Sequence, residues 1–257
     1  MRHESSEWWS DYLSTFHREQ PGITEDILSS TTSARGLNPY QWIVAPIPLG
    51  SRTLDLACGS GPSLRQRPGE RWIGIDRSIS ELTRSHFSGT DNILQGDATA
   101  LPFDDATFDA VVCSMAVMVI QPLGAALDEV YRVLRPGGMF VVTMPGRRPV
   151  SIRDVARYAR LVAHLRRHRL TYPNEHVLRR DRTTFESRGF ELIEDTRLGF
   201  RLAIDTPETA MRFVESLYVP GATSANVSRA QRLAAMWVGS DIGIPLRRIT
   251  TRRGLAA

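Results

Sequence analysis

One stretch narrows most strongly what this chain can fold into, and it reads Thr53-Leu54-Asp55-Leu56-Ala57-Cys58-Gly59-Ser60-Gly61. It predicts a short buried strand that ends in a tight turn, because glycine is needed where the backbone takes a positive φ or lies against a ligand. A second apolar strand is predicted at residues 72–75, and it ends in Asp76. A doubly wound fold places an acid about 20 residues beyond its glycine turn on the ribose of a bound nucleotide. The two strands together predict a site for an adenosine-bearing cofactor.

The composition of the turn discriminates between two such cofactors. A dinucleotide site uses Gly-x-Gly-x-x-Gly and directs backbone N–H groups at pyrophosphate. Here Leu64 occupies the place of the third glycine, Pro62 removes an N–H donor, and Asp55 would bring negative charge close to a dianion. S-adenosylmethionine has no phosphate and carries an ammonium and a sulfonium. The turn therefore favours S-adenosylmethionine over NAD.

Five motifs in this order resemble those of the class I S-adenosylmethionine-dependent methyltransferases, especially the ubiquinone/menaquinone-biosynthesis-like branch. They are Leu54–Gly61, Gly74–Ser78, Gln95–Phe103, Phe108–Ser114 and Val133–Gly138, within a core from about Arg52 to Met144. The chain departs from the family pattern at Ala57, which stands where the usual turn has its first glycine. The prolines at 62 and 68 also require a short helix before the second strand.

The resemblance implies an α/β, Rossmann-like, doubly wound sheet of seven strands with an antiparallel final strand. Alternation of predicted strands and helices independently favours a parallel sheet with helices on both faces. Residues 1–42 are rich in aromatic side chains and are expected to form an N-terminal helical lid, or alternatively a helix packed on the sheet edge. Residues 43–257 would form the methyltransferase domain, with substrate-wall insertions at about 145–177 and 205–240.

The resemblance also implies roles for individual residues in the cofactor site. Asp55 would lie near the methionine ammonium, Asp76 would accept hydrogen bonds from the ribose hydroxyls, and Asp97 would accept one from the adenine amine. The other cofactor-binding candidates are Ala57, Gly59, Gly61, Arg77, Ala98 and Ser114. The alternative for any single Asp is an ordinary residue at a strand end or turn.

The sequence assigns no catalytic residue, because methyl transfer from a sulfonium depends mainly on alignment. Proximity and orientation can supply roughly 7–11 kcal/mol. A histidine could still accept a proton from the acceptor, and His17 and His176 are the weak candidates, although each is better explained as a surface histidine. Tyr12 and Tyr40 could touch the cofactor or the substrate, or could simply pack within helices.

Composition excludes several classes of protein. There is no run of about 18 apolar residues, so no membrane span is expected, and the acidic start does not resemble a secretory signal. The two cysteines form neither a disulfide framework nor a metal site, so no metal and a reducing cytoplasmic location are expected. The chain has a net charge of +4 and contains arginine but no lysine, which excludes lysine chemistry.

Two other functions remain open. Arginines from residue 147 to residue 182, with more near the C-terminus, are compatible with a nucleic-acid methyltransferase or binding protein. However, the chain lacks the Asn/Asp-Pro-Pro-aromatic tetrad of base-amino methylation. The second alternative is a fold relative that does not transfer methyl groups. We expect a small-molecule acceptor methylated on O, N or C, in bacterial specialised metabolism. The sequence does not indicate the oligomeric state.

Three local expectations concern the second half of the chain. Ile152, Val155, Ala159 and Val162 are spaced as the apolar stripe of a basic amphipathic helix, with arginines opposite. Asp205 is expected to cap a helix that begins at Pro207. A helix is also predicted after Pro122, with Leu123, Leu127, Val130 and Leu134 on one face.

Overall fold

A computed structural model describes residues 6–87, 92–179 and 183–255. The described residues form one sheet in the order β1-β7-β8-β6-β5-β2-β3-β4. The strands are β1 (Thr31–Ser33), β2 (Thr53–Leu56), β3 (Trp72–Asp76), β4 (Ile93–Gln95), β5 (Phe108–Ser114), β6 (Leu134–Pro145), β7 (Phe190–Ile204) and β8 (Ser240–Arg253). The five strands from β2 to β6 run parallel to one another. The Rossmann-like fold expected from the sequence is thus confirmed.

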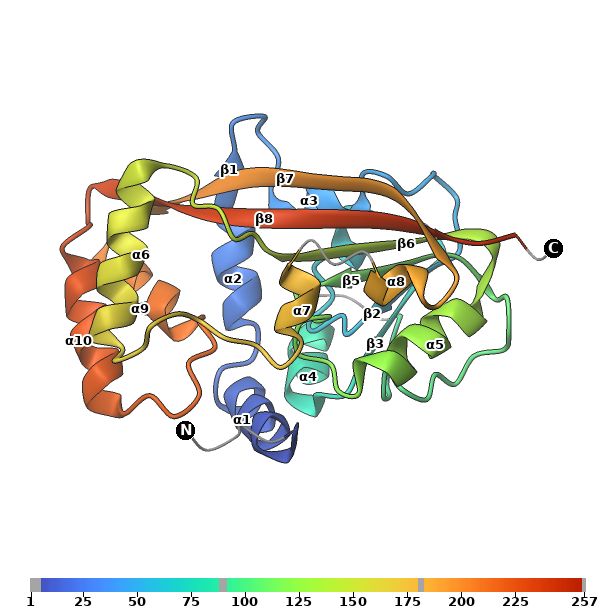
Figure 1. Ribbon diagram of the computed structural model, residues 1–257, viewed down its shortest axis with the longest axis horizontal. Helices are drawn as coiled ribbons and strands as arrows, with labels where there is room; N and C mark the ends of the chain where they lie inside the picture. The colour runs from blue at the N-terminus through green and yellow to red at the C-terminus, as the bar shows by residue number, and fades with distance from the viewer. Residues whose placement is uncertain (1–5, 88–91, 180–182, 256–257) are drawn as a thin grey trace.

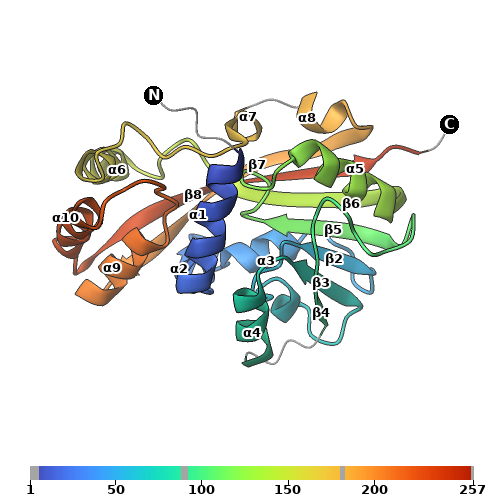
Figure 2. The ribbon, with the colours of Figure 1, turned by 90° about the horizontal axis from the view of Figure 1, so that it is seen from below.

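Helices cover both faces of this sheet, as Figures 1 and 2 show. They are α1 (Ser6–Glu19), α2 (Ile23–Ser29), α3 (Pro39–Val44), the 3-10 turn η1 (Leu64–Gln66), α4 (Ile79–Phe87), α5 (Leu123–Val133), α6 (Ile152–His164), α7 (Glu175–Leu178), α8 (Thr183–Glu186), α9 (Pro207–Glu215) and α10 (Ser224–Ala235). In Figure 2, α5, α7 and α8 lie on one side of the parallel strands and α3 and α4 on the other. The parallel strands are therefore buried on both faces, which explains their almost continuous apolar sequences.

The helix predicted after Pro122 is confirmed as α5, except that it ends at Val133 and Leu134 is extended and begins β6. Leu123, Leu127 and Val130 are all buried in it, and they join the core cluster that also contains Phe108 and Phe140. Their spacing of four and three residues places them on one face of the helix, which packs against β6.

The order of the strands reverses between β2 and β5. From β2 the chain continues outward through β3 to β4, whereas β5 returns to the other side of β2 and is followed by β6. Ligands of doubly wound sheets bind at such a reversal, beyond the carboxyl ends of the strands. The turn after β2 and the end of β5 are thus in the expected place for a cofactor.

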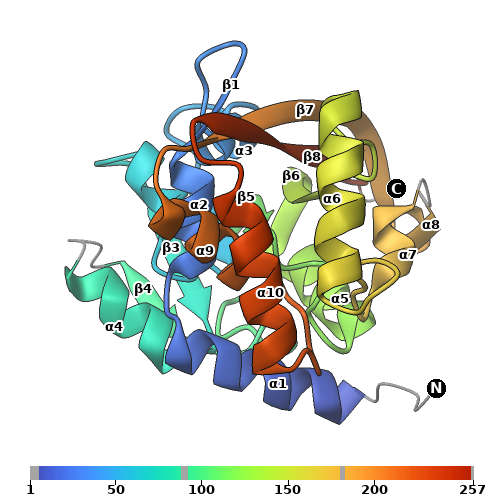
Figure 3. The ribbon, with the colours of Figure 1, turned by 90° about the vertical axis from the view of Figure 1, so that its left-hand side faces the viewer.

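The sheet has eight described strands rather than the expected seven. The additional strand is β1, which comes from the N-terminal segment and pairs antiparallel with β7. The final strand β8 is antiparallel to both β6 and β7, as expected. Because β7 and β8 pair over their full length, they extend beyond the parallel strands, and α6, α9 and α10 gather at their far end (Figures 1 and 3).

Two local expectations were wrong. In α6, Ile152 is 90% exposed and Val155 is 51% exposed, so the apolar stripe does not face the protein. Asp154 and Leu161 are buried there instead. At the start of α9 the cap is Thr206, whose hydroxyl accepts the N–H of Thr209, and not Asp205. A threonine directly before Pro207 is one residue closer to the free N–H groups of the first turn.

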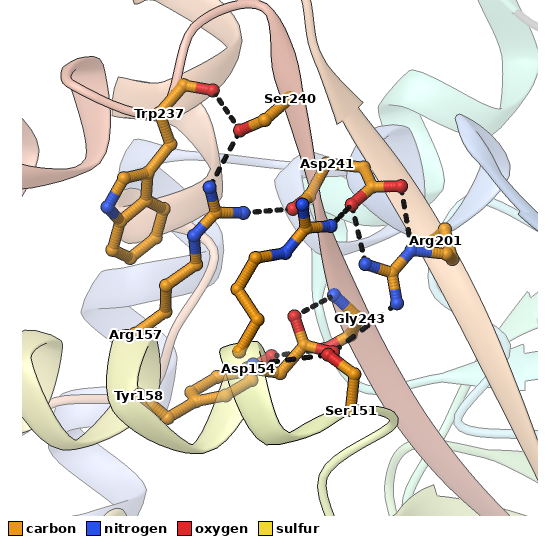
Figure 4. A network of polar contacts seen from close by, with 10 residues as sticks. Ser151, Asp154, Arg157, Tyr158, Arg201, Trp237, Ser240, Asp241 and Gly243 are labelled. Carbon is orange, nitrogen blue, oxygen red and sulfur yellow. Dashed lines mark hydrogen bonds and ion pairs between the residues drawn. The ribbon is translucent and has the colours of Figure 1, made fainter.

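A network of ion pairs and hydrogen bonds around the buried Asp154 explains the orientation of α6 (Figure 4). The Asp154 carboxylate accepts the Ser151 hydroxyl at 2.6 Å and the Gly243 N–H at 3.0 Å. Arg201 approaches it at 3.3 Å and also pairs with Asp241 at 2.5 Å. These contacts join α6 to β7 and β8.

The arginines of α6 take part in the same network. Arg153 forms an ion pair with Asp241, and Arg157 donates to the Ser240 hydroxyl at 2.8 Å. The Arg157 guanidinium also lies 5.2 Å from the ring centre of Trp237. These arginines are used in holding the helix against the sheet.

Replacing Asp154 by alanine should lower the free energy of unfolding by about 2–4 kcal/mol, because the Gly243 N–H would remain buried without a partner. The hydrogen bonds and Arg201 hold the pKa of this carboxyl below its usual range despite its burial. Its contribution is therefore present at neutral pH and is lost as the pH falls through the lowered folded-state value, below about pH 4. Urea unfolding at pH 7 and pH 3 measures this, with Asp128→Ala at an exposed position as control. Equal stability of the two variants at pH 7 would contradict the assigned role.

Candidate functional site

A cavity of about 430 Å³ lies at the carboxyl ends of the central strands. Most residues predicted to bind the cofactor line it: Ala57, Gly59, Asp76, Arg77, Asp97, Ala98 and Ser114. They come from the ends of β2, β3, β4 and β5 and from the turns that follow. The structure thus brings together residues that are up to 57 positions apart in the sequence, from Ala57 to Ser114.

The turn after β2 has the tight backbone that its glycines predict. Gly59 and Gly61 have φ values of 56° and 81°, and Ala57 has 54°. Ala57 therefore occupies the left-handed region without being glycine, at a cost of roughly 1–2 kcal/mol. Met115, directly after β5, has a φ of 57° and also lines the cavity. Strained residues of this kind concentrate at functional sites.

Asp76 connects the turn to the start of α4. One of its carboxylate oxygens accepts the Gly59 N–H at 2.8 Å, and the other accepts the Ser78 N–H at 2.8 Å. Burial raises the pKa of this carboxyl, while the two N–H donors counteract the rise. Each oxygen keeps a second lone pair that can accept a hydroxyl from a ligand in the cavity.

Asp97 is held in a turn of its own at the edge of the cavity. It accepts both the N–H and the hydroxyl of Thr99, at 2.8 Å and 2.7 Å. The Thr99 N–H holds the pKa of Asp97 below its usual range, so the side chain stays ionised. Its neighbour in the cavity, Arg77, donates to the Ser10 hydroxyl of α1 at 3.1 Å. The N-terminal helix is thus tied to the end of β3.

Asp55 does not line the cavity but lies directly behind the turn. It is 1% exposed, and neither of its oxygens has a hydrogen-bond partner among the described residues. Ser60 and Ser63, which do line the cavity, are equally buried and their hydroxyls are also unpartnered. Ser63 is close enough to moderate the pKa of Asp55 without meeting it in hydrogen-bond geometry, and burial raises that pKa to about 8.

These three orphaned groups test whether the site fits S-adenosylmethionine. A buried carboxylate without a partner is costly, and a cation placed beside it relieves the cost. Two buried hydroxyls can orient such a cation because each can both donate and accept. The donor set therefore fits a ligand with an ammonium group, and it disfavours one with a pyrophosphate.

Tyr40 and His17, two of the weaker candidates, line the same cavity. Tyr12 does not: its hydroxyl accepts the Val219 N–H at 2.9 Å within an aromatic cluster of α1, and burial raises its pKa. His176 is exposed in α7 and also lies outside the cavity lining. Gly61 shapes the turn without facing the cavity.

Glu81 is the functional candidate that the sequence did not indicate. It lies in the first turn of α4, is 5% exposed and lines the cavity. Its carboxylate accepts the Gly22 N–H and contacts His17 Nδ1 at 2.8 Å. The pattern Ser78-x-x-Glu81 resembles a capping box, which would have suggested a purely local role. Its actual partners are more than 55 residues earlier in the chain.

A second cavity of about 350 Å³ adjoins the first, and Thr24, Met115 and Tyr218 line both. Its walls are mainly apolar and aromatic. They include Tyr158 and Tyr172 from the first expected insertion and Phe213 and Leu217 from the second. An apolar molecule bound there would lie next to the larger cavity.

Comparison with known proteins supports the class that this fold and site define. Residues 54–142 match the family model described as a methyltransferase domain. The match agrees with the Rossmann-like sheet and with the resemblance to class I S-adenosylmethionine-dependent methyltransferases, and it implies S-adenosylmethionine as the cofactor. The resemblance inferred from the motifs is thereby confirmed.

Particular relatives match over the same part of the chain. A demethylmenaquinone methyltransferase of Clavibacter sepedonicus is 38% identical over 115 residues, which cover 42% of this chain and 46% of the relative. The corresponding protein of Renibacterium salmoninarum is 36% identical over 123 residues, or 47% of this chain and 52% of the relative. The chain thus spans about half the length of the curated relatives it matches.

Solved structures share the fold at low sequence identity. One of them has a TM-score of 0.59 at 15% identity, and the alignment covers 96% of this chain and 93% of the other chain. It comes from work on the conversion of a disulfide bond into a thioacetal group during echinomycin biosynthesis. The [4+2]-cyclase SpnF has a TM-score of 0.53 at 20% identity, with coverages of 84% and 81%. Among the described residues, no helix has the length and apolar character needed to cross a membrane.

Proposed function

We propose that this protein transfers a methyl group from S-adenosylmethionine to a small molecule. The observation that carries the proposal is the pairing of two adjoining cavities. The larger is lined by Asp76, Asp97 and part of the glycine turn expected for the cofactor, and the smaller is mainly apolar. Thr24, Met115 and Tyr218 line both, so a ligand in one cavity would face a ligand in the other at these residues.

The residues of the larger cavity would bind and orient the cofactor. Asp76 and Asp97 offer acceptors for the ribose hydroxyls and the adenine amine, and Asp55 offers a negative charge for the ammonium. When bound, S-adenosylmethionine supplies an activated methyl group on a sulfonium. The protein would then accelerate transfer mainly by aligning the acceptor with that methyl group.

We also propose that the N-terminal segment closes over the cofactor, and that the two later insertions form the acceptor wall. In support, His17 of α1 and Thr24 of α2 line the larger cavity. The segment is not a wholly helical lid, because β1 belongs to the sheet. The part that could act as a lid is therefore α1 and α2. Tyr158 and Phe213 support the assignment of the insertions, since both line the smaller cavity.

The nucleic-acid alternative loses support from the contacts of its arginines. Besides Arg153 and Arg157, Arg169 is paired with Glu175 at 2.7 Å. Arg247 is 2% exposed and paired with Asp195. Residues 180–182 of the arginine-rich segment lie outside the described residues. Arginines already bound within the protein are less available for phosphates.

Calorimetric titration with S-adenosylmethionine, S-adenosylhomocysteine and NAD tests the cofactor. We expect both adenosyl ligands to bind, and NAD not to bind, because Asp55 and the unpartnered serines favour a cation over a pyrophosphate. Preference for NAD would contradict the proposal. Salt-sensitive RNA binding at low micromolar concentration would favour the nucleic-acid alternative. Cofactor binding without methylation of any acceptor in a broad panel would favour a fold relative that does not transfer methyl groups.

A further inference from the structure

The boundary between the two cavities contains a chain of three hydrogen-bonded side chains. The Glu81 carboxylate contacts His17 Nδ1 at 2.8 Å, and His17 Nε2 contacts the Tyr218 hydroxyl at 3.2 Å. All three residues line the larger cavity, and Tyr218 also lines the smaller one. They come from α1, α4 and the segment after α9, so that only folding brings them together.

The position of Glu81 determines which atoms donate and which accept along the three hydrogen-bonded side chains. Both carboxylate oxygens accept the Gly22 N–H at 3.0 Å, which holds the carboxylate in place. A carboxylate beside Nδ1 favours the tautomer with the proton on Nδ1, leaving Nε2 as an acceptor. The Tyr218 hydroxyl then donates its proton to Nε2. Its oxygen keeps lone pairs that can accept a hydrogen bond from a molecule in either cavity.

A second hydroxyl lies at the same boundary. Thr24 Oγ1 is buried beside the Tyr218 hydroxyl, and the two do not meet in hydrogen-bond geometry. It has no other partner among the described residues, although Thr24 lines both cavities. A buried hydroxyl without a partner is unfavourable unless a ligand forms a hydrogen bond with it. Thr24 can therefore orient a polar group of the acceptor towards Tyr218.

We propose that Tyr218 is a catalytic residue that accepts the proton of an aromatic acceptor's hydroxyl group, with His17 and Glu81 as positioning residues behind it. This rests on the methyltransferase function proposed above and specifies its acceptor as a phenol methylated on oxygen. The aromatic character follows from the apolar walls of the smaller cavity, which include Tyr172 and Phe213. We infer that the reacting group of the acceptor is a hydroxyl because Tyr218 and His17 can together accept its proton.

The atoms and charges of this step balance. As the acceptor oxygen forms its bond to the methyl carbon, the bond from that carbon to sulfur breaks and the sulfonium becomes a neutral thioether. The acceptor proton passes to the Tyr218 oxygen while the Tyr218 proton passes to His17 Nε2. The resulting imidazolium is stabilised by the Glu81 carboxylate, as in other carboxylate–histidine pairs.

The test uses 4-nitrophenol as the acceptor probe, because its phenolate absorbs visible light. In protein saturated with S-adenosylhomocysteine, we expect the bound probe to ionise with a constant about tenfold larger than that of the free probe. Tyr218→Phe keeps the ring and removes the hydroxyl, so it should abolish this increase. His17→Gln should reduce it. Tyr131→Phe is the matched control, since Tyr131 packs against Phe190 away from both cavities.

The second readout is turnover with S-adenosylmethionine, followed as 4-nitroanisole formed. We expect the wild-type protein to form it. At a pH below the pKa of the free probe, where the probe is protonated, Tyr218→Phe should have a kcat lower by about 10²–10⁴, the usual contribution of a proton acceptor. Retained binding of S-adenosylhomocysteine shows that this variant is folded. The His17→Gln protein could be unfolded, because His17 joins α1 to α4. In that case the comparison of Tyr218→Phe with the wild-type protein is sufficient to test the proposal.

Three results would overturn the inference. They are ionisation of the probe that is the same in Tyr218→Phe as in wild type, a methyl group found on a ring carbon, and no binding of 4-nitrophenol to protein that does bind S-adenosylhomocysteine. In each of these cases the proposed methyltransferase function stands. Failure of the wild-type protein to bind S-adenosylhomocysteine would instead refute the proposed function, and the proton path with it.

Discussion

Replacing Asp76 by alanine should weaken the binding of S-adenosylhomocysteine about a hundredfold. The carboxylate holds the N–H groups of Gly59 and Ser78, each at 2.8 Å, and offers its remaining lone pairs to the ribose. Without it, both N–H groups lose their partner and the ligand loses a charged acceptor. Together these losses amount to about 3 kcal/mol, and every 1.4 kcal/mol is about tenfold in affinity.

Calorimetric titration measures this loss, and thermal unfolding in the absence of ligand shows whether the variant is folded. Asp104→Ala is the matched control, because Asp104 is an exposed aspartate outside the cavity lining. We expect the control to bind as the wild-type protein does. An Asp76→Ala protein that is folded and binds within about twofold of wild type would show that the ribose does not depend on this carboxylate.

The part of the site that the sequence predicted is the part built from local signals. The strand ends at Asp55 and Asp76 follow apolar runs that can only be buried, and Gly59 follows from the need for a positive φ. These residues belong to neighbouring parallel strands, whose carboxyl ends necessarily meet at one edge of the sheet. Local sequence therefore determined that Gly59 and Asp76 meet at one cavity, with Asp55 directly behind the turn.

Features that depend on tertiary contacts could not be predicted in the same way. The strand β1 has three residues, Thr31 to Ser33, and it exists because β7 is long enough to offer a free edge. The periodicity of α6 predicted a buried apolar stripe, yet its orientation is set by Asp154 and its partners on β7 and β8. A pattern of apolar residues cannot reveal a buried ion pair, because it counts every charged residue as exposed.

Glu81 shows the same limit within the site. Its spacing from Ser78 predicts a helix cap, and the Glu81 N–H does approach the Ser78 hydroxyl at 3.4 Å. The side chain instead turns towards Gly22 and His17. A short-range motif thus concealed a long-range contact, and the boundary between the two cavities became visible only in the fold.

Replacing Asp55 by asparagine should have opposite effects on stability and on cofactor binding. Burial raises the pKa of this carboxyl to about 8, whereas an unfolded chain gives a value near 3.9. Between about pH 4 and pH 8 the unfolded state therefore releases a proton that the folded state retains. Because the unfolded state binds fewer protons in this range, the stability of the ligand-free protein falls as the pH rises.

At 1.36 kcal/mol per pKa unit, the raised pKa of Asp55 should lower the free energy of unfolding of the ligand-free wild-type protein by about 4 kcal/mol as the pH rises from 4 to 7. Asp55→Asn cannot ionise and should lack this part of the pH dependence, so the difference in unfolding free energy between variant and wild type should grow with pH. Urea unfolding at pH 5, 6 and 7 measures the difference, and contributions from all other groups cancel in it.

The same substitution should weaken binding, because the ligand ammonium would lose the charge that the buried carboxylate supplies when it ionises. In the wild-type protein, binding below pH 8 should release a proton from Asp55. Calorimetry in two buffers of different ionisation enthalpy detects that proton, and Asp55→Asn should not release it. A wild-type protein that binds S-adenosylhomocysteine without releasing a proton, or a variant with the same pH dependence of stability, would mean that Asp55 is already ionised in the ligand-free fold. The unpartnered carboxyl behind the turn would then have no part in selecting a cationic ligand.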